Sequence, residues 1–312
     1  MNLLNKKILQ YFLPKMKFLN FFKNFLKKRI FSIFNTKIKY SYRNWDSNIS
    51  SLSSKDRNKY FNIVCSGTLN HVFPTDKFKN ILLCGQPKSA SLYITQLLSF
   101  SLKLDSHWIG LDKGSGSIYY PKILETKFIN RNTISHCHAA ADNKTIKIIK
   151  NLSLQPLILS RNLLDSLVSR RDMLLKDKSN FPIKFEKFAS SNIEYQLDCV
   201  IDLFASSYIS FYSGWKNFDE KQNANINPYF ITYEQLLSTE KYLVESVAKF
   251  YNLHFDEDLY TKTTKDIKKI GGINLSKGIK GRGKLLFNDR QKNLIREKAS
   301  YYSCFDSEFL GC

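Results

Sequence analysis

The sequence predicts an α/β fold: a central parallel sheet covered by helices on both faces, preceded by a basic helical arm. Three observations support this prediction. Short apolar runs alternate with longer segments of helical periodicity from residue 79 onward. These runs lack a regular polar alternation, as expected for strands that are buried on both faces. With 312 residues, of which 43% are hydrophobic, the chain can bury a large core, which excludes disorder of the whole chain.

Each expected strand is a short apolar run, and a segment with helical periodicity follows it. Strands are expected at 79–84, directly before a glycine, and at 133–138, 157–159 and 230–232. Helices are expected at 91–102, 144–152, 164–176, 193–218 and 235–251. Because ligands of such folds bind beyond the carboxyl ends of the strands, the residues that follow these runs are the candidates for function.

Residues 1–60 are expected to form a basic amphipathic arm and linker, and residues 61–312 the α/β domain. Residues 1–43 contain eleven Lys and Arg but no Asp or Glu, about half of the excess behind the net charge of +21. Between positions 17 and 28, Phe and Leu share one helical face, whereas Lys and Asn share the other. Two interpretations stay open: a helix that contacts an anionic membrane surface through residues 14–34, or one that packs on the domain.

Cysteine usage favours a reducing compartment. The six cysteines are scattered without a CxxC pair, which argues against a zinc site and against a dense disulfide framework. No apolar run reaches the roughly 18 to 20 residues of a transmembrane helix. Lysines among the first 17 residues interrupt any signal-peptide core. We therefore expect a cytoplasmic protein, associated with a membrane surface if the arm binds lipid.

The segment after the first expected strand has the features of a phosphate-binding loop. It reads Gly85-Gln86-Pro87-Lys88-Ser89-Ala90-Ser91-Leu92 and leads into a helix. Backbone N–H groups at a helix N-terminus, the helix dipole and the charge of Lys88 all favour an anion. The loop differs from the GxxxxGK[ST] sequence of nucleoside triphosphatases. An ordinary strand–helix turn with N-capping serines would share part of its pattern.

Together with this loop, later segments resemble the sulfotransferases that use 3′-phosphoadenosine-5′-phosphosulfate (PAPS). The loop is similar to the family's G-x-P-K-S-G-T-T. The stretch 161–169 is similar to its R-[ND]-P-x-D-x-x-x-S, and 276–283 resembles the K-G-x-x-G-R-G loop of its bacterial members. The stretch 232–237 is similar to its Y-E-D-L segment. The resemblance covers roughly residues 78–311 and implies a P-loop-type sheet.

Four positions depart from the family pattern. Alanine replaces a glycine at Ala90, leucine replaces a threonine at Leu92 and a proline at Leu163, and serine replaces an arginine at Ser276. We expect these changes to weaken cofactor binding, for example because alanine has less backbone freedom than glycine.

The resemblance assigns roles to the matching residues. Lys88 and the backbone of 89–92 would bind the 5′-phosphosulfate of PAPS, and Arg161 and Ser169 its 3′-phosphate. Tyr233 would lie near the adenine, and 277–282 would close over the cofactor. The implied cofactor-binding set is Gly85, Lys88, Ser89, Ala90, Ser91, Leu92, Arg161, Ser169, Tyr233, Lys277, Gly278 and Arg282. No metal is expected.

A catalytic base is expected near the end of the strand at 133–138, where the family commonly has a histidine. Side chains two positions apart share a face of a strand, so His136 and His138 are both candidates. His138 is preferred because it lies nearer the carboxyl end, and the pKa range of histidine suits general-base catalysis. The expected catalytic residues are His138, Lys88 and His136, with Glu125 or Asp142 as alternatives. The remaining histidines are expected to lie at the surface or in the core, and Trp108 and Trp215 are expected to lie in the core.

The expected function is sulfuryl transfer from PAPS to an acceptor hydroxyl of a glycan or glycolipid. One version of this hypothesis has an acidic acceptor. Positioning and electrostatics would drive this in-line displacement. The acceptor pocket is expected in the loops 103–130 and 178–195. The alternatives are a P-loop kinase, a degenerate sulfotransferase fold that anchors to membranes, and a basic nucleic-acid-binding protein. No nucleic-acid partner is expected, because no zinc finger, RNP-like segment or basic zipper is found.

Overall fold

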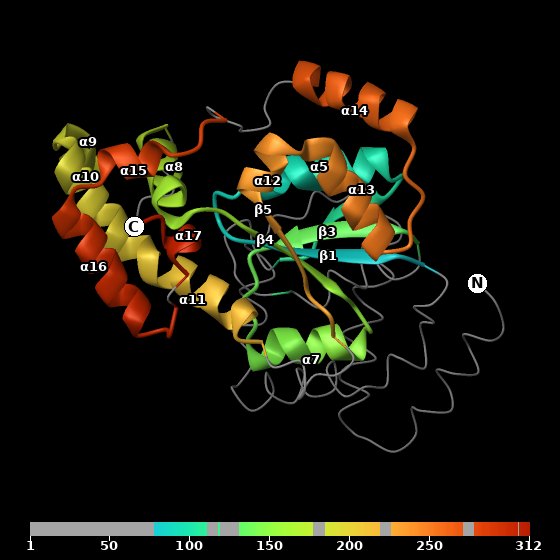
Figure 1. Cartoon of the computed structure of the whole chain (residues 1–312), viewed down its shortest axis with the longest axis horizontal. Helices are drawn as coiled ribbons and strands as arrows, with labels where there is room; N and C mark the ends of the chain where they lie inside the picture. Colours follow the sequence, from blue (N-terminus) through green and yellow to red (C-terminus); the bar gives the residue numbers. More distant parts are fainter. Residues whose placement is uncertain are drawn as a thin grey trace, which may run out of the picture. The chain divides into compact units, whose positions relative to one another are not determined.

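The computed structural model describes residues 78–110, 118, 131–176, 185–218, 226–270, 278–304 and 306–312. Within these ranges it confirms the predicted α/β class, a parallel sheet with helices on both faces (Figure 1). The arm and linker at 1–60 lie outside the described residues, so the domain boundary and the membrane contact through 14–34 stay predictions. No helix among the described residues is long and apolar enough to span a bilayer.

The sheet has five strands in the order β2-β3-β1-β4-β5, and each neighbouring pair is parallel. The strands are β1 (Asn80–Gly85), β2 (Asp105–Trp108), β3 (Thr133–Cys137), β4 (Pro156–Ser160) and β5 (Tyr229–Thr232). Four of them confirm the expected strands. The edge strand β2 falls within 103–130, which we assigned wholly to loop. Its sequence Asp-Ser-His-Trp carries no apolar run, because its first two residues are exposed.

The helices largely follow the predicted pattern. They are α5 (Ser91–Ser101), α7 (Asn143–Asn151), α8 (Leu163–Lys176), α9 (Phe185–Ser190), α10 (Ile193–Val200), the π-helical η4 (Ile201–Ala205), α11 (Ser206–Lys216), α12 (Tyr233–Ser238), α13 (Glu240–Phe250), α14 (Glu257–Ile270), α15 (Arg282–Leu286), α16 (Asp289–Ser300) and α17 (Ser307–Leu310). The prediction of one helix over 235–251 was wrong. Thr232 and Gln235 form a capping box that starts α12 early, and Thr239 then leaves the helical conformation.

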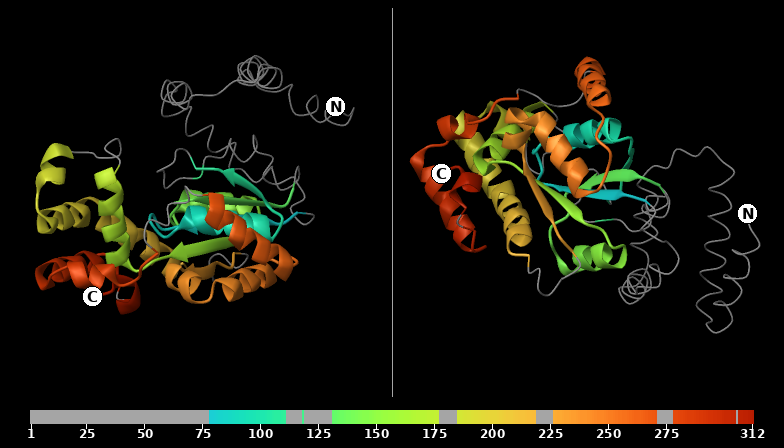
Figure 2. Two further views of the ribbon diagram at one scale, coloured as in Figure 1. Left: turned by 90° about the horizontal axis from the view of Figure 1, so that it is seen from above. Right: turned by 45° about the vertical axis from the view of Figure 1, so that its right-hand side comes forward.

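Two apolar layers cover the sheet, one on each face. Alternate residues of β1 point to opposite sides. Ile81 and Leu83 pack into a cluster with α5, α12 and α13, and Leu82 and Cys84 into a cluster with α7 and α11. Figures 1 and 2 show α5, α12 and α13 on one side of the strands and α7 on the other. Because both faces are covered, the carboxyl ends of the strands are the free positions for a ligand.

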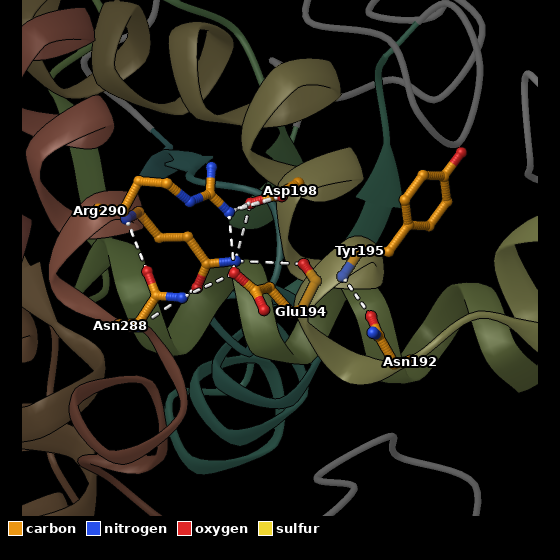
Figure 3. A network of polar contacts seen from close by, with 7 residues as sticks. Asn192, Glu194, Tyr195, Asp198, Asn288 and Arg290 are labelled. Carbon is orange, nitrogen blue, oxygen red and sulfur yellow. Dashed lines mark hydrogen bonds and ion pairs between the residues drawn. The ribbon is translucent and has the colours of Figure 1, made fainter.

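A third apolar cluster holds α8, α10, η4, α11, α16 and α17 together. A polar network joins α16 to α10 beside this cluster (Figure 3). The Arg290 guanidinium lies 2.7 Å from Asp198 and 3.2 Å from Glu194, and Asn288 also donates to Glu194. Exposed ion pairs contribute little one by one, so we interpret this network as fixing the register of the two helices.

Candidate functional site

The loop between β1 and α5 contains two residues with a left-handed backbone. Lys88 and Ala90 have left-handed backbones, with φ of 70° and 67°. A left-handed residue other than glycine costs about 1–2 kcal/mol, so Ala90 occupies a conformation that glycine would adopt more readily. A Cβ atom at Gly85 would lie 2.9 Å from the Cβ of Ser91, so the start of the loop requires glycine.

Gln86 connects this loop to β4 and α8. Its side chain is buried. The Nε2 group donates to Ser166 Oγ at 3.0 Å, and Oε1 accepts from the Arg161 backbone N–H at 3.2 Å. The Ser89 hydroxyl donates to the Gln86 carbonyl at 2.6 Å. The sequence prediction missed Gln86, because a glutamine after a strand indicates a structural role only when its burial is known.

Arg161 follows β4 and lies against the loop. Its Nη1 donates to the Lys88 carbonyl at 3.0 Å, and its guanidinium carbon lies 4.0 Å from the centre of the Tyr233 ring. Its Nε is buried with no hydrogen-bond partner in the described part of the chain. Tyr233 therefore supports Arg161 through a cation–π contact. The predicted proximity of Tyr233 to adenine stays a prediction.

The glycine-rich segment near the C-terminus docks on α8. Both oxygens of Asp165 accept backbone N–H groups, from Gly281 at 2.6 Å and from Gly283 at 2.7 Å. A Cβ at Gly283 would lie 2.4 Å from the Leu164 Cβ. Gly278 is exposed. Lys277 and Ser276 lie outside the described residues, as does Glu125.

Arg282, a predicted cofactor ligand, is paired within the protein. Its Nη2 lies 2.6 Å from Asp172 Oδ2, and Arg171 lies 3.1 Å from the other oxygen of the same carboxylate. Asp172 thus holds two arginines of the site together.

Ser169, predicted to bind the 3′-phosphate, is buried two turns into α8. Leu92 is 44% exposed on the first turn of α5.

His138 lies just beyond β3 and is tied to the start of the loop. Its Nδ1 lies 2.6 Å from the Gly85 carbonyl oxygen. A carbonyl oxygen can only accept, so Nδ1 carries the proton and Nε2 keeps a free lone pair. Burial is the main cause that lowers the pKa of His138, and the charges of Arg170 and Lys88 lower it further. The imidazole is therefore neutral near pH 7 and able to accept a proton.

His136 has a different environment from His138. Burial is the main cause that lowers the pKa of His136 to about 4, and His138 adds to the effect. Its ring meets that of Trp108 edge-on, with centroids 4.5 Å apart, and the Trp108 and His138 centroids are 6.3 Å apart. Trp108, expected to be a core residue, is half-buried and packs beside both candidate bases. Trp215 is buried in the core and donates to the Ala139 carbonyl at 3.0 Å.

Lys88 lies in a strongly positive environment. Its pKa is lowered to about 8, first by burial and then by the charges of Arg170, Arg161 and Lys176, whereas Asp172 acts in the opposite direction. The sequence prediction missed Arg170, which is the first cation among these causes. An excess of cations together with an unpartnered guanidinium nitrogen fits a ligand with several negative charges.

Of the alternative bases, Asp142 has a structural role, because its carboxylate accepts from the Thr145 N–H and caps α7. Among the described residues, no group of three or more His, Cys, Asp and Glu side chains is arranged to bind a metal.

Cys84 and Cys137 lie opposite each other on β1 and β3 with sulfur atoms 3.9 Å apart. These two thiols are free and buried.

Comparison with solved structures shows that the chain has the sulfotransferase fold. It aligns with the mouse sulfotransferase SULT7A1, crystallised in complex with PAP, at a TM-score of 0.52 and 16% identity over 72% of this chain and 85% of that one. A sulfotransferase from Alicyclobacillus acidocaldarius aligns at a TM-score of 0.34 and 12% identity, over 61% of this chain and 92% of that one. No family model and no curated protein matches the sequence.

Proposed function

We propose that the protein is a PAPS-dependent sulfotransferase that transfers a sulfuryl group to an acceptor hydroxyl. One observation carries this proposal: His138, a candidate base, is hydrogen-bonded to the loop that contains the half-buried Lys88. His138 is hydrogen-bonded to the carbonyl of Gly85, and the carbonyl of Lys88 accepts from Arg161. The loop thus joins groups that could deprotonate an acceptor and stabilise an anionic leaving group.

The residues around the loop fit the anionic groups of PAPS. Lys88 and the backbone N–H groups of 89–92 would hold the 5′-phosphosulfate, at the N-terminus of α5. Arg161 and Ser169 would hold the 3′-phosphate, since the planar guanidinium matches pairs of phosphate oxygens. Gly278 and Arg282 would close over the donor together with Lys277. Arg282 would then share its charge between the donor and Asp172.

When bound, PAPS supplies the activated sulfuryl group. His138 Nε2 would take the proton of the acceptor hydroxyl, because its lone pair is free and the imidazole is neutral. Lys88 is mostly protonated near pH 7, since its pKa is about 8, and would stabilise the charge that develops on the leaving phosphate. His136 remains the second candidate base, with its ring held against Trp108.

We propose a glycan or glycolipid as the acceptor class. The support is the positive charge of the site together with the basic arm, whose residues 14–34 would bring the enzyme to an anionic membrane surface. The protein would then act in the cytoplasm, at or near a membrane.

The first experiment incubates the protein with radiolabelled PAPS and a panel of hydroxyl acceptors, and follows the release of adenosine 3′,5′-bisphosphate (PAP). Lys88→Ala should lower turnover by about 100- to 1,000-fold, the size of one lost electrostatic stabiliser. Lys262→Ala, which removes an exposed charge on α14, should leave turnover unchanged. Sulfation that survives Lys88→Ala would disprove the role of this lysine.

The second experiment separates catalysis from donor binding. His138→Gln should lower turnover by roughly 100- to 10,000-fold, as the loss of a general base does, and should leave PAP affinity within a few-fold of wild type. His136→Gln should have the smaller effect. A wild-type protein that binds PAP but sulfates no acceptor would be the degenerate fold. A protein that neither binds PAP nor releases it would exclude the proposed function.

A further inference from the structure

Arg170 lies on the face of α8 that meets the phosphate-binding loop. Ser166, one helical turn earlier, accepts a hydrogen bond from Gln86 of that loop at 3.0 Å. Residues four apart lie on the same face of a helix. Arg170 therefore lies one helical turn beyond Ser166 on the same face of α8.

Aromatic side chains, rather than a carboxylate, hold the Arg170 guanidinium. Its Nε donates to the Tyr208 hydroxyl at 2.8 Å. Its guanidinium carbon lies 4.7 Å from the centre of the Phe204 ring and 5.9 Å from that of Tyr208. Phe204 belongs to the π-helical segment η4, and such segments are frequent at functional sites. Aromatic contacts orient the guanidinium but leave its charge uncompensated.

The other arginines of the site have a carboxylate partner or are already proposed to bind the donor. Arg161 donates to the Lys88 carbonyl and stacks on Tyr233, and Arg171 and Arg282 share the carboxylate of Asp172. Arg170 is half-buried and pairs with no carboxylate in the described part of the chain. Among the described residues, its Nη1 makes a weak contact, 4.0 Å from the sulfur of Met173.

The charge of Arg170 acts on both groups that would carry out the reaction. Among charged residues, Arg170 is the largest cause of the lowered pKa of Lys88 and also of His138, ahead of Lys88 itself. An acceptor hydroxyl must come within hydrogen-bond reach of the base, and in-line transfer places it opposite the leaving phosphate. We therefore expect a cation that acts on His138, on the face of α8 that meets the loop, to face the acceptor.

We propose that Arg170 determines acceptor specificity, by binding a carboxylate that the acceptor carries close to its reacting hydroxyl, as in a uronic acid. This inference rests on the proposed sulfotransferase function. The planar guanidinium can donate two parallel hydrogen bonds to a carboxylate, and Tyr208 and Phe204 hold it in one orientation before the acceptor arrives.

The test compares two glycosides that differ in one carboxylate, p-nitrophenyl β-D-glucuronide and p-nitrophenyl β-D-glucoside. Their binding to the full-length, PAP-loaded protein is measured by ligand-detected NMR titration, which requires no turnover. The glucuronide should bind more tightly by at least about tenfold, as one charge-assisted contact predicts. Arg170→Ala should bring the ratio of the two affinities to about one, and Arg170→Lys, which keeps the charge but loses the planar fork, to an intermediate value.

Two further variants control this result. Arg296→Ala removes the same charge from an exposed position on α16 and should keep the wild-type ratio. Tyr208→Phe keeps the ring but removes the hydroxyl that accepts from Arg170, and should lower the ratio only in part. Thermal unfolding of each variant shows whether a lost ratio reflects lost folding.

The proposal is overturned if the wild-type protein binds the two glycosides equally or binds neither. It is also overturned if Arg170→Ala or Arg170→Lys weakens PAP binding itself, because the arginine would then serve the donor. Failure of the sulfotransferase function gives a separate result, the absence of PAP binding by the wild-type protein, which is measured first in the same titration.

Discussion

Burial and neighbouring charge set the chemistry of the individual site residues. Lys88 is an ordinary lysine in the sequence, but burial beside Arg170 and Arg161 lowers its pKa to about 8. His138 is kept neutral in the same way, and the Gly85 carbonyl fixes the position of its proton. The anionic donor that we propose would offset the repulsion among these cations.

The lowered pKa of Lys88 gives PAP binding a defined pH dependence. A bound anion favours the protonated amine and raises its pKa, so binding takes up a proton whenever Lys88 is neutral beforehand. PAP affinity should fall as pH rises through about 8, by up to tenfold per pH unit for one linked proton. Isothermal titration calorimetry in buffers of different ionisation enthalpy measures both the affinity and the proton uptake.

Lys88→Arg is the matched control for this dependence, because an arginine stays protonated throughout the range. Its PAP affinity should be lower than that of wild type at neutral pH and nearly independent of pH up to about 9. An unchanged wild-type affinity between pH about 7 and 9 would show that Lys88 does not titrate in this range.

The sequence identified Lys88, Arg161 and His138 as candidates because each follows a strand inside a short, local pattern. It did not identify Gln86 or Arg170. A glutamine after a strand and an arginine on a helix are common, and both acquire a role here only through what lies across from them. These partners are 80 and 38 residues away along the chain, which no local pattern encodes.

At the scale of elements, helix α8 joins the parts of the site. Its first turns anchor the phosphate-binding loop through Ser166 and the glycine-rich segment through Asp165. Arg170 and Asp172 lie further along the same helix and contact η4, α11 and α15. A small shift of α8 would therefore move together the groups that we propose to bind the donor and the acceptor.

This arrangement makes Gly283 more sensitive than its neighbour Gly281. A methyl group at Gly283 would clash with the backbone of α8, 2.5 Å from the Leu164 carbonyl carbon, whereas one at Gly281 meets nothing within 4 Å. Gly281→Ala should cost about 1–2 kcal/mol for its left-handed backbone. Gly283→Ala should cost about 3–5 kcal/mol, because overpacking adds to the loss of a charge-assisted hydrogen bond to Asp165.

Urea unfolding of the two variants, followed by circular dichroism, checks this order. Gly283→Ala should also weaken PAP binding, because the segment that begins at Gly278 would lose its docking on α8. A free energy of unfolding for Gly283→Ala equal to that of Gly281→Ala would contradict the close packing between α15 and α8.

At the scale of the whole molecule, the positive charge has two separate sources. About half of the net charge of +21 lies in residues 1–43, and residues 44–312 carry the rest, including the cations of the site. The two sources have different expected partners, an anionic lipid surface for the arm and an anionic donor and acceptor for the domain.

Exchanging lysines for glutamine in the full-length protein tests whether the arm, and not the domain, binds the lipid surface. The triple variant Lys23→Gln, Lys27→Gln, Lys28→Gln should reduce binding to vesicles rich in phosphatidylserine by on the order of 100-fold, at about 1 kcal/mol per lysine. The matched control exchanges Lys249, Lys262 and Lys265, which are exposed on α13 and α14, and should keep vesicle binding. Co-sedimentation measures both, and equal losses in the two variants would show that the arm is not the membrane contact.

The sequence by itself determined the fold class and four of the five strands. It also singled out the segments 161–169 and 276–283 as partners of the loop between β1 and α5. Both results were possible because apolar periodicity and loop chemistry are local properties. Only the tertiary structure decided which charges stay free. Arg282, expected to serve the donor, pairs with Asp172, and Arg170, not noticed in the sequence, keeps its charge against two aromatic rings. The physical reason is that pairing and burial depend on residues far apart in the chain, which meet only when the helices pack.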